Sequence, residues 1–182
     1  MRWLFSRERC SIGSGRLIFF DESGINLSMA RGYARAERGE RAIGHVPKNW
    51  GDSVTIAAGI GLRGLIAPLL MHGSMNGEIF DAYIEQFVVP ELHEGDLVVL
   101  DNLSAHKLRS VRERIEAVGA QVIFLPPYSP DLNPIELAWS KVKAILRSLA
   151  ARTYEDLEHA VVAALSAITA GDIAGWFRHC GY

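Results

Sequence analysis

Cysteine is scarce in this chain of 182 residues, and long apolar runs are missing from it. The two cysteines, Cys10 and Cys180, stand near opposite ends without a second Cys or a His pair at ligand spacing, so the sequence indicates neither a disulfide framework nor a zinc site. No window reaches the roughly 18 apolar residues that a membrane span needs. We therefore expect a cytoplasmic protein without a membrane partner.

An excess of charge of either sign is also missing. The net charge of -2 argues against a protein that binds nucleic acid through bulk electrostatics, although it leaves room for a local basic face. There is no Gly-rich phosphate loop of the GxxxxGK kind, which argues against an enzyme acting on small phosphorylated substrates. The apolar fraction of 49% is enough for one sizeable core, and hence for a single domain.

Strand and helix patterns alternate along the chain. Apolar runs bounded by turn residues predict five strands, at 16–20, 54–62, 64–73, 96–102 and 121–126. Helical spacing of apolar residues predicts helices at 76–92, 107–118 and 133–149, and then a helical C-terminus that begins near Thr153. Interleaved strands and helices indicate an α/β fold. The segment 26–50, rich in Gly and Arg, favours no regular structure.

Three acids stand where predicted strands or helices end or begin. Asp21 is expected to close the first strand, Asp101 closes the fourth, and Glu136 stands at the start of a helix. If strands one and four are neighbours, both aspartates emerge at the carboxyl edge of the sheet, where open α/β sheets bind ligands. Taken singly, each acid is explained as well by a turn or a helix cap. Their joint placement favours a shared carboxylate site.

The stretch "PPYSPDLNPIELAWSKVK" (126–143) fixes the start of the last of these helices. Asn133 is a favourable N-cap, Pro134 suits the first helical position, and Glu136 follows in the first turn. The apolar stripe expected to face the core is Ile135, Ala138, Val142, Ile145 and Leu149. Glu136 shares the other side with Lys143 and Arg147. The helix N-terminus favours an ionised Glu136, which is a useful property in a metal ligand.

The motifs "FFDESG", "VVLDNLSAHK" and "LPPYSPDLNPIELAWSKVK" resemble those of the DDE-superfamily transposases, specifically the bacterial insertion-sequence relatives of mariner elements. In that family 34 residues separate the second aspartate from the glutamate, and 34 residues lie between Asp101 and Glu136 here. The resemblance runs from about Arg16 to the C-terminus. It implies a ribonuclease-H-like fold: a mixed five-stranded sheet of order 3-2-1-4-5, flanked by helices.

The chemistry that this resemblance implies is phosphoryl transfer on DNA with two Mg²⁺ ions, for which Mn²⁺ can substitute. On the family pattern Asp21 would bridge both ions, and Asp101 and Glu136 would each hold one. The same site would hydrolyse DNA at the transposon ends and then join the freed 3′-hydroxyl to target DNA.

Three further residues have a functional and a structural reading each. Asn102 would orient Asp101 or shape the turn after it. His106 matches the family's "DN...H" pattern and would touch a phosphate near the metals, or else it packs or caps a helix. Lys143 lies on the Glu136 side of its helix and would contact DNA, or it is simply solvated.

The resemblance also predicts the domain organisation. Residues 1–15 are expected to be linker or read-through sequence, and residues 16–182 the catalytic domain. The helix-turn-helix domain of full-length relatives is expected to be absent, so a separate upstream helix-turn-helix polypeptide could supply end recognition. A homodimer is left open. The alternatives are a ribonuclease-H-like nuclease without strand transfer and a truncated, non-catalytic remnant.

Overall fold

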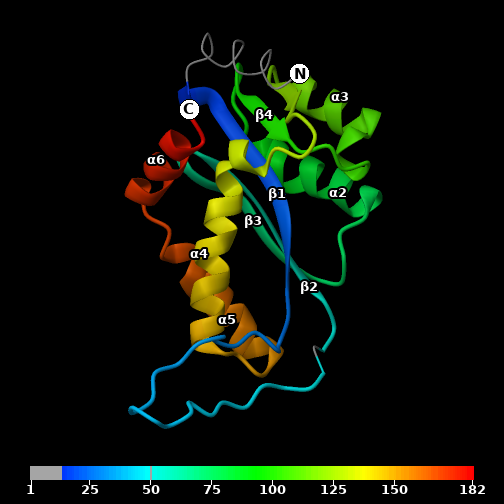
Figure 1. Ribbon diagram of the computed structural model, residues 1–182. Helices are drawn as coiled ribbons and strands as arrows, with labels where there is room; N and C mark the ends of the chain where they lie inside the picture. The colour runs from blue at the N-terminus through cyan, green and yellow to red at the C-terminus, as the bar shows by residue number, and fades with distance from the viewer. Residues whose placement is uncertain (1–13, 50) are drawn as a thin grey trace.

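The computed structural model describes residues 14–49 and 51–182, which fold around one mixed sheet (Figure 1). The strands are β1 (Leu17–Ile25), β2 (Val54–Gly61), β3 (Gly64–His72), β4 (Leu97–Leu100) and β5 (Gln121–Phe124). Their order in the sheet is β3-β2-β1-β4-β5, as the family resemblance implies. β2 runs antiparallel to both of its neighbours, whereas β4 is parallel to β1 and to β5.

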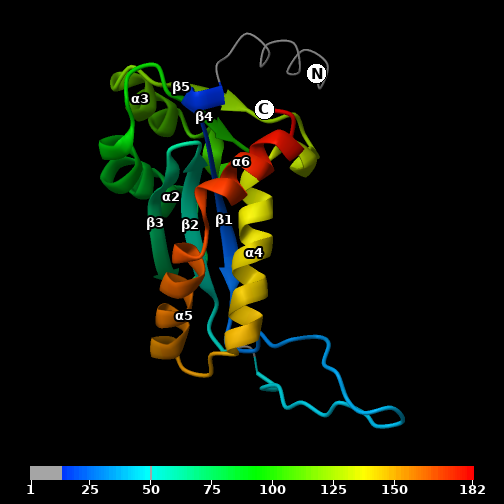
Figure 2. The ribbon, with the colours of Figure 1, turned by 90° about the vertical axis from the view of Figure 1, so that its left-hand side faces the viewer.

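Helices cover both faces of the sheet (Figure 2). They are α2 (Gly77–Tyr83), α3 (Arg109–Ala117), α4 (Pro134–Leu149), α5 (Tyr154–Ser166) and α6 (Ala170–His179). A π-helical turn (Ile84–Val88) and a 3₁₀ turn (Val89–Glu91) extend α2. Further 3₁₀ turns lie at Ser14–Arg16, Ala105–Lys107 and Pro130–Leu132. The helical C-terminus is therefore confirmed.

Alternation along β1 divides the core in two. Phe19 packs in the cluster that α4, α5 and α6 share with the sheet, and Phe20 packs in the cluster on the α2 and α3 side. Both rings are buried. Successive side chains of a strand point to opposite faces, so Asp21 lies on the α4 side and Glu22 on the α2 side.

The sequence prediction for the first strand was wrong in its end point. β1 does not stop at Phe20 but runs on to Ile25, so Asp21 lies within a strand and pairs with Ala58 of β2. The reason is tertiary: β2 continues to offer backbone hydrogen bonds after β4 has ended, and Ile25 is buried. A long antiparallel partner thus overrides the turn signal of "DESG".

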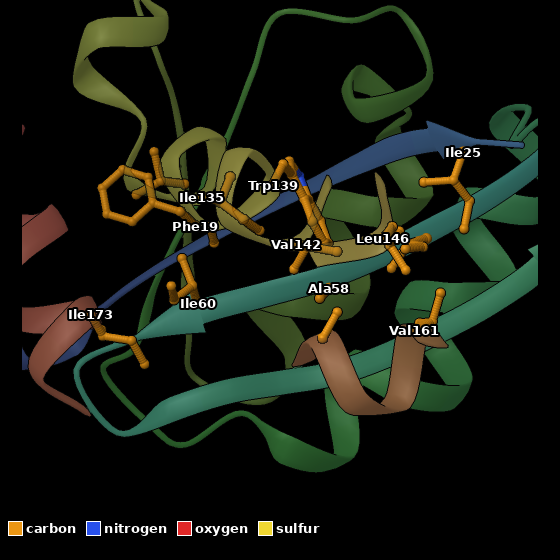
Figure 3. Packing of buried hydrophobic residues seen from close by; sticks show 14 of the residues in the cluster. Phe19, Ile25, Ala58, Ile60, Ile135, Trp139, Val142, Leu146, Val161 and Ile173 are labelled. Carbon is orange, nitrogen blue, oxygen red and sulfur yellow. The ribbon is translucent and has the colours of Figure 1, made fainter. Parts of the chain in front are cut away.

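Helix α4 packs against the sheet through buried residues from Ile135 to Leu146 (Figure 3). Figure 3 shows Trp139 and Leu146 of this helix within the cluster, and both are buried. The expected stripe had Ile145 and Leu149 in their place. Ile145 is only partly buried because it lies at the margin of the stripe, and Leu149, in the last turn, is 52% exposed. The stripe was predicted correctly in its first half.

Some expectations fall on residues outside the described ranges. The linker segment 1–15 lies almost wholly there, and so does Cys10. Within the described ranges no single helix is long and apolar enough to cross a membrane; α5 and α6 reach that length and composition only together, as a pair bent by 73°.

Gly59 of β2 offers a test of how the strand beside the acids is packed. A Cβ added at Gly59 would overlap the buried ring of Phe20, the residue before Asp21. We expect Gly59→Ala to lower the free energy of unfolding by about 1–3 kcal/mol, measured by urea unfolding. Gly24→Ala is the control, since nothing lies within 4 Å of its added Cβ. Equal losses in the two variants would contradict this packing.

Candidate active site

The parallel pairing of β1 with β4 places two acids side by side. Leu17 lies opposite Leu97 and Phe19 opposite Val99, and the same offset carries Asp21 to the level of Asp101. β4 ends at Leu100, so Asp101 is the first residue beyond its carboxyl edge.

Glu136 approaches this edge from α4. It stands in the first turn of the helix, is exposed, and lines a cavity of about 460 Å³ together with Asp101. The pKa of Asp21 is raised to about 7. Burial is the largest cause, and the negative charges of Glu136, Glu22 and Asp101 add to it. Asp101 and Glu136 therefore share one cavity, and Asp21, which does not line that cavity, lies near enough for their charges to raise its pKa.

The donor chemistry of this group suits a hard divalent cation. In residues 14–49 and 51–182 no group of three or more His, Cys, Asp or Glu side chains is placed so that together they could hold a metal ion. Carboxylate oxygens are nevertheless the ligands that Mg²⁺ and Mn²⁺ prefer. Burial and like charge oppose the ionisation of Asp21, and a bound cation would offset both. Asp21, Asp101 and Glu136 thus fit such an ion in chemistry and charge.

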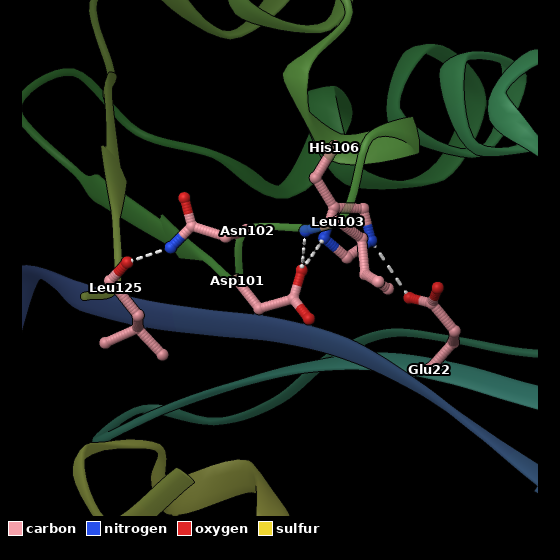
Figure 4. A network of polar contacts seen from close by, with 6 residues as sticks. All are labelled: Glu22, Asp101, Asn102, Leu103, His106 and Leu125. Carbon is pink, nitrogen blue, oxygen red and sulfur yellow. Dashed lines mark hydrogen bonds and ion pairs between the residues drawn. The ribbon is translucent and has the colours of Figure 1, made fainter. Parts of the chain in front are cut away.

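A buried histidine holds Asp101 in place (Figure 4). His106 Nδ1 lies 2.6 Å from Asp101 Oδ1, and His106 Nε2 lies 3.1 Å from Glu22 Oε2. The imidazole is 1% exposed and packs against Phe80, with 4.3 Å between ring centroids. Burial alone would lower the pKa of His106, but the hydrogen bonds to Asp101 and Glu22 raise it to about 9. At neutral pH His106 is therefore an imidazolium that donates to both carboxylates.

This contact fixes the charge and the orientation of Asp101. Burial would raise the pKa of Asp101, but hydrogen bonds from His106 and from the Leu103 amide, 2.8 Å from Oδ1, outweigh it and lower the pKa. Both bonds use Oδ1, and Figure 4 shows Oδ2 turned away from the histidine. Since His106 lies beneath the site and not on its surface, the geometry favours a positioning role over contact with a phosphate.

Asn102 and Lys143 are the other two candidates, and only Asn102 lines the cavity. The side-chain amide of Asn102 donates to the carbonyl oxygen of Leu125 and so joins the ends of β4 and β5, which supports its turn-shaping reading. Lys143 is seven residues beyond Glu136 on α4, about 10 Å along the helix axis, and it is partly buried. It does not line the cavity.

Asn133 occupies the N-cap position of α4 as expected, but its side chain does not form a capping bond. It is 4% exposed, and its Oδ1 has no hydrogen-bond partner among the described residues. Sequence reasoning also missed Tyr128, which lines the same cavity. Its position between Pro127 and Ser129, in a cluster of turn residues, was the available signal.

Comparison with known proteins gives the family. The profile described as DDE superfamily endonuclease matches residues 16–158, which is more than half of the sequence, and the chain belongs to this family. Residues 16–158 thus form a DDE superfamily endonuclease domain. A search of curated proteins gives no match.

Solved structures give the fold. The pre-cleavage Mos1 transpososome has a TM-score of 0.76 at 18% identity, covering 98% of this chain and 55% of that one. For the mariner Mos1 paired end complex with Mg these values are 0.75, 18%, 98% and 57%. For the catalytic domain of Mos1 mariner transposase they are 0.62, 18%, 98% and 81%. The fold is ribonuclease-H-like, as expected, and the chain spans about half the length of the chains in the first two.

The raised pKa of Asp21 predicts how pH acts on the metal-free protein. Folding raises the pKa of Asp21 from 3.8 to about 7, so ionisation of this carboxyl is less favourable in the folded than in the unfolded protein. The free energy of unfolding is therefore unaffected by this group below about pH 4, and it falls as pH rises through 7. Asparagine cannot ionise. We expect Asp21→Asn to exceed wild type in free energy of unfolding by about 1–4 kcal/mol at pH 8, with the gap closing toward pH 4.

Urea unfolding in EDTA measures this difference. Asp52→Asn, which removes an exposed carboxylate before β2, serves as the control and should show no such gain. An Asp21→Asn protein that matches wild type at pH 8 would show that the folded chain does not resist ionisation of Asp21.

The bridge through His106 predicts a titration that NMR can follow directly. The imidazole should titrate near pH 9, and Glu22→Gln should lower its pKa by about one unit or more, because one of two ionised acceptors is lost. Glu158→Gln, an exposed change in α5, should leave the titration unchanged. A wild-type value near 6.5 would mean that the imidazole is not held between two carboxylates.

Proposed function

We propose that this chain is the catalytic domain of a metal-dependent DNA transposase. It would hydrolyse phosphodiester bonds at the ends of a mobile element and then join the freed 3′-hydroxyl to target DNA. The observation that carries the proposal is the cavity that Asp101 and Glu136 line beyond the end of β4, together with the position of Asp21 on the neighbouring strand β1. Membership of the DDE superfamily endonuclease family supports it.

Asp21, Asp101 and Glu136 would hold two Mg²⁺ ions, or Mn²⁺ in their place. Such ions activate the attacking water or 3′-hydroxyl and stabilise the leaving oxygen. Mos1 complexes have been solved with Mn and with Mg. The role of these residues toward a metal is thus supported by donor chemistry, by charge and by the family.

The residues around the acids prepare them for this task. His106 occupies Oδ1 of Asp101 and so leaves Oδ2 for a ligand. Glu136 stands exposed in the first turn of α4, beside the cavity. With a pKa of about 7, the carboxyl of Asp21 still carries a proton in part of the metal-free molecules at neutral pH, and it would release this proton when a cation binds.

DNA is the proposed partner. Residues 26–49 form neither helix nor strand and extend away from the sheet (Figures 1 and 2). Their arginines, which are exposed, are Arg31, Arg35, Arg38 and Arg41. Together with Lys143 they would contact phosphates. Transposon ends would be recognised with the help of a helix-turn-helix polypeptide, in a bacterial insertion-sequence setting in the cytoplasm. The paired-end complex of Mos1 transposase supports two copies acting together.

Thermal unfolding with Mn²⁺ tests the metal site first. A ligand at a hundred times its dissociation constant stabilises by about 2.7 kcal/mol, so the midpoint of wild type should rise by roughly 5–10 °C. Asp101→Asn should lose this rise, whereas Asp52→Asn should keep it. No rise in wild type, or an equal rise in Asp101→Asn, would favour a non-catalytic remnant.

Cleavage and joining assays on DNA test the reaction itself. We expect Asp21→Asn, Asp101→Asn and Glu136→Gln each to abolish metal-dependent cleavage while the protein stays folded. Each of them replaces a carboxylate that would bind a metal ion by a neutral amide. Glu158→Gln is the control for charge loss. Cleavage retained in any of the three removes that residue from the site. Cleavage by wild type without joining of a 3′-hydroxyl would indicate a ribonuclease-H-like nuclease instead.

A further inference from the structure

Asp101 is held through one of its two carboxylate oxygens. Its Oδ1 accepts from His106 Nδ1 at 2.6 Å and from the Leu103 amide at 2.8 Å. Both partners are donors, because an ionised carboxylate can only accept hydrogen bonds. A carboxylate oxygen has two lone pairs, so these two bonds saturate Oδ1. Oδ2, which Figure 4 shows turned away from the histidine, is the oxygen left for a further ligand.

One short turn supplies both donors. The 3₁₀ turn Ala105–Lys107 follows Leu103, and the His106 amide donates to the Leu103 carbonyl oxygen at 3.1 Å. The backbone therefore fixes the two donors relative to each other. The Leu103 contact alone is an ordinary Asx turn, in which an aspartate accepts from the amide two residues further on. The bond from the imidazole is what this turn adds.

The imidazole of His106 is itself fixed from its other nitrogen. The residue is 1% exposed and packs on Phe80, and Nε2 lies 3.1 Å from Glu22 Oε2. Rotation of the ring would break hydrogen bonds to two carboxylates at a buried position, where unpaired polar groups are costly. Glu22 comes from β1, so the strand that carries Asp21 also holds the histidine that bonds Asp101. The single free oxygen of Asp101 is hence a property of the fold.

The number of oxygens that a carboxylate offers affects which cation it suits. Ca²⁺ takes more oxygen ligands than Mg²⁺ and readily uses both oxygens of one carboxylate. Mg²⁺ requires a near-octahedral arrangement and keeps several waters, so one carboxylate oxygen is enough. To offer both oxygens to a cation, Asp101 would have to give up hydrogen bonds at Oδ1. One such bond to a charged group corresponds to about 10- to 150-fold in a dissociation constant.

We propose that His106, held by Glu22, determines the metal specificity of this site: by occupying Oδ1 it limits Asp101 to one oxygen and so favours Mg²⁺ and Mn²⁺ over Ca²⁺. The inference rests on the proposed function, because it takes Asp101 as a metal ligand. It adds that the choice of cation is made from the α2 side of the sheet. His106 is thus a positioning residue that acts through Asp101.

Two substitutions of His106 separate its two hydrogen bonds. The amide nitrogen of asparagine can take the place of Nδ1, and that of glutamine the place of Nε2. His106→Asn should therefore keep the bond to Asp101 and lose the bond to Glu22, whereas His106→Gln should do the reverse. Both replace the imidazolium by a neutral amide, so each variant is the charge control for the other.

Thermal unfolding measures the specificity without DNA and without cleavage. The rise of the midpoint with cation concentration gives one dissociation constant for Mg²⁺ and one for Ca²⁺. His106→Gln should shift the ratio of the two constants toward Ca²⁺ by about 10-fold or more relative to wild type, because Oδ1 becomes available. His106→Asn should stay close to the wild-type ratio. A histidine that only stabilises the fold would lower the midpoint and leave the ratio unchanged in both variants.

NMR of the unmodified protein tests the same point if a variant does not fold. The Nδ1 proton of His106 should remain hydrogen-bonded, and so protected from exchange with water, when Mg²⁺ saturates the site. Loss of this protection on addition of Mg²⁺ would show that Asp101 gives up its bond at Oδ1, and it would overturn the inference.

The outcomes distinguish this inference from the function on which it rests. A ratio that keeps its wild-type value in His106→Gln, or that shifts equally in both variants, overturns the role of His106. If such a protein still cleaves DNA with Mg²⁺, the proposed function stands alone. A shift in His106→Gln only, in a protein that does not cleave DNA, supports the specificity role and counts against the proposed function. No rise of the wild-type midpoint with either cation counts against both.

Discussion

The parallel pairing of β1 with β4 is the constraint on which the rest of the site depends. Over three residue pairs, from Leu17 with Leu97 to Phe19 with Val99, it fixes the register of the two strands. β4 then ends, while β1 continues beside β2. Asp21 is consequently held within a strand, and Asp101 lies beside it in a loop. Asp21 is partly buried and held by strand pairing, whereas Asp101 needs a further support.

That support comes from the opposite face of the sheet. His106 lies on the α2 side and bonds Asp101 and Glu22 with its two ring nitrogens. Because the imidazole is an ion between two carboxylates, it also lowers the net negative charge that gathers at this edge. His106 also connects the acids to the core, because Phe80, which is buried in the core on that face, packs directly on its ring.

Helix α4 links the other core to the cavity. Ile135 is fully buried beneath the helix start, whereas its neighbour Glu136 is exposed. The turn before the helix contrasts with this well-packed segment. Tyr128 has a strained backbone and an exposed ring, and Asn133 keeps a buried, unpaired oxygen. A left-handed φ at a residue with a Cβ and a buried polar atom without a partner both cost stability.

The sequence by itself determined the element types, the strand order that its motifs imply, and the three acids as candidates. Apolar periodicity and proline placement are local properties, so Pro134 could mark the start of α4 before any contact was known. Only the tertiary structure decided that β1 passes through Asp21, that Leu146 and not Leu149 enters the core, and that His106 joins Glu22 to Asp101. Each of these depends on a partner far away in the chain, and a local pattern carries no information about which partner will be there.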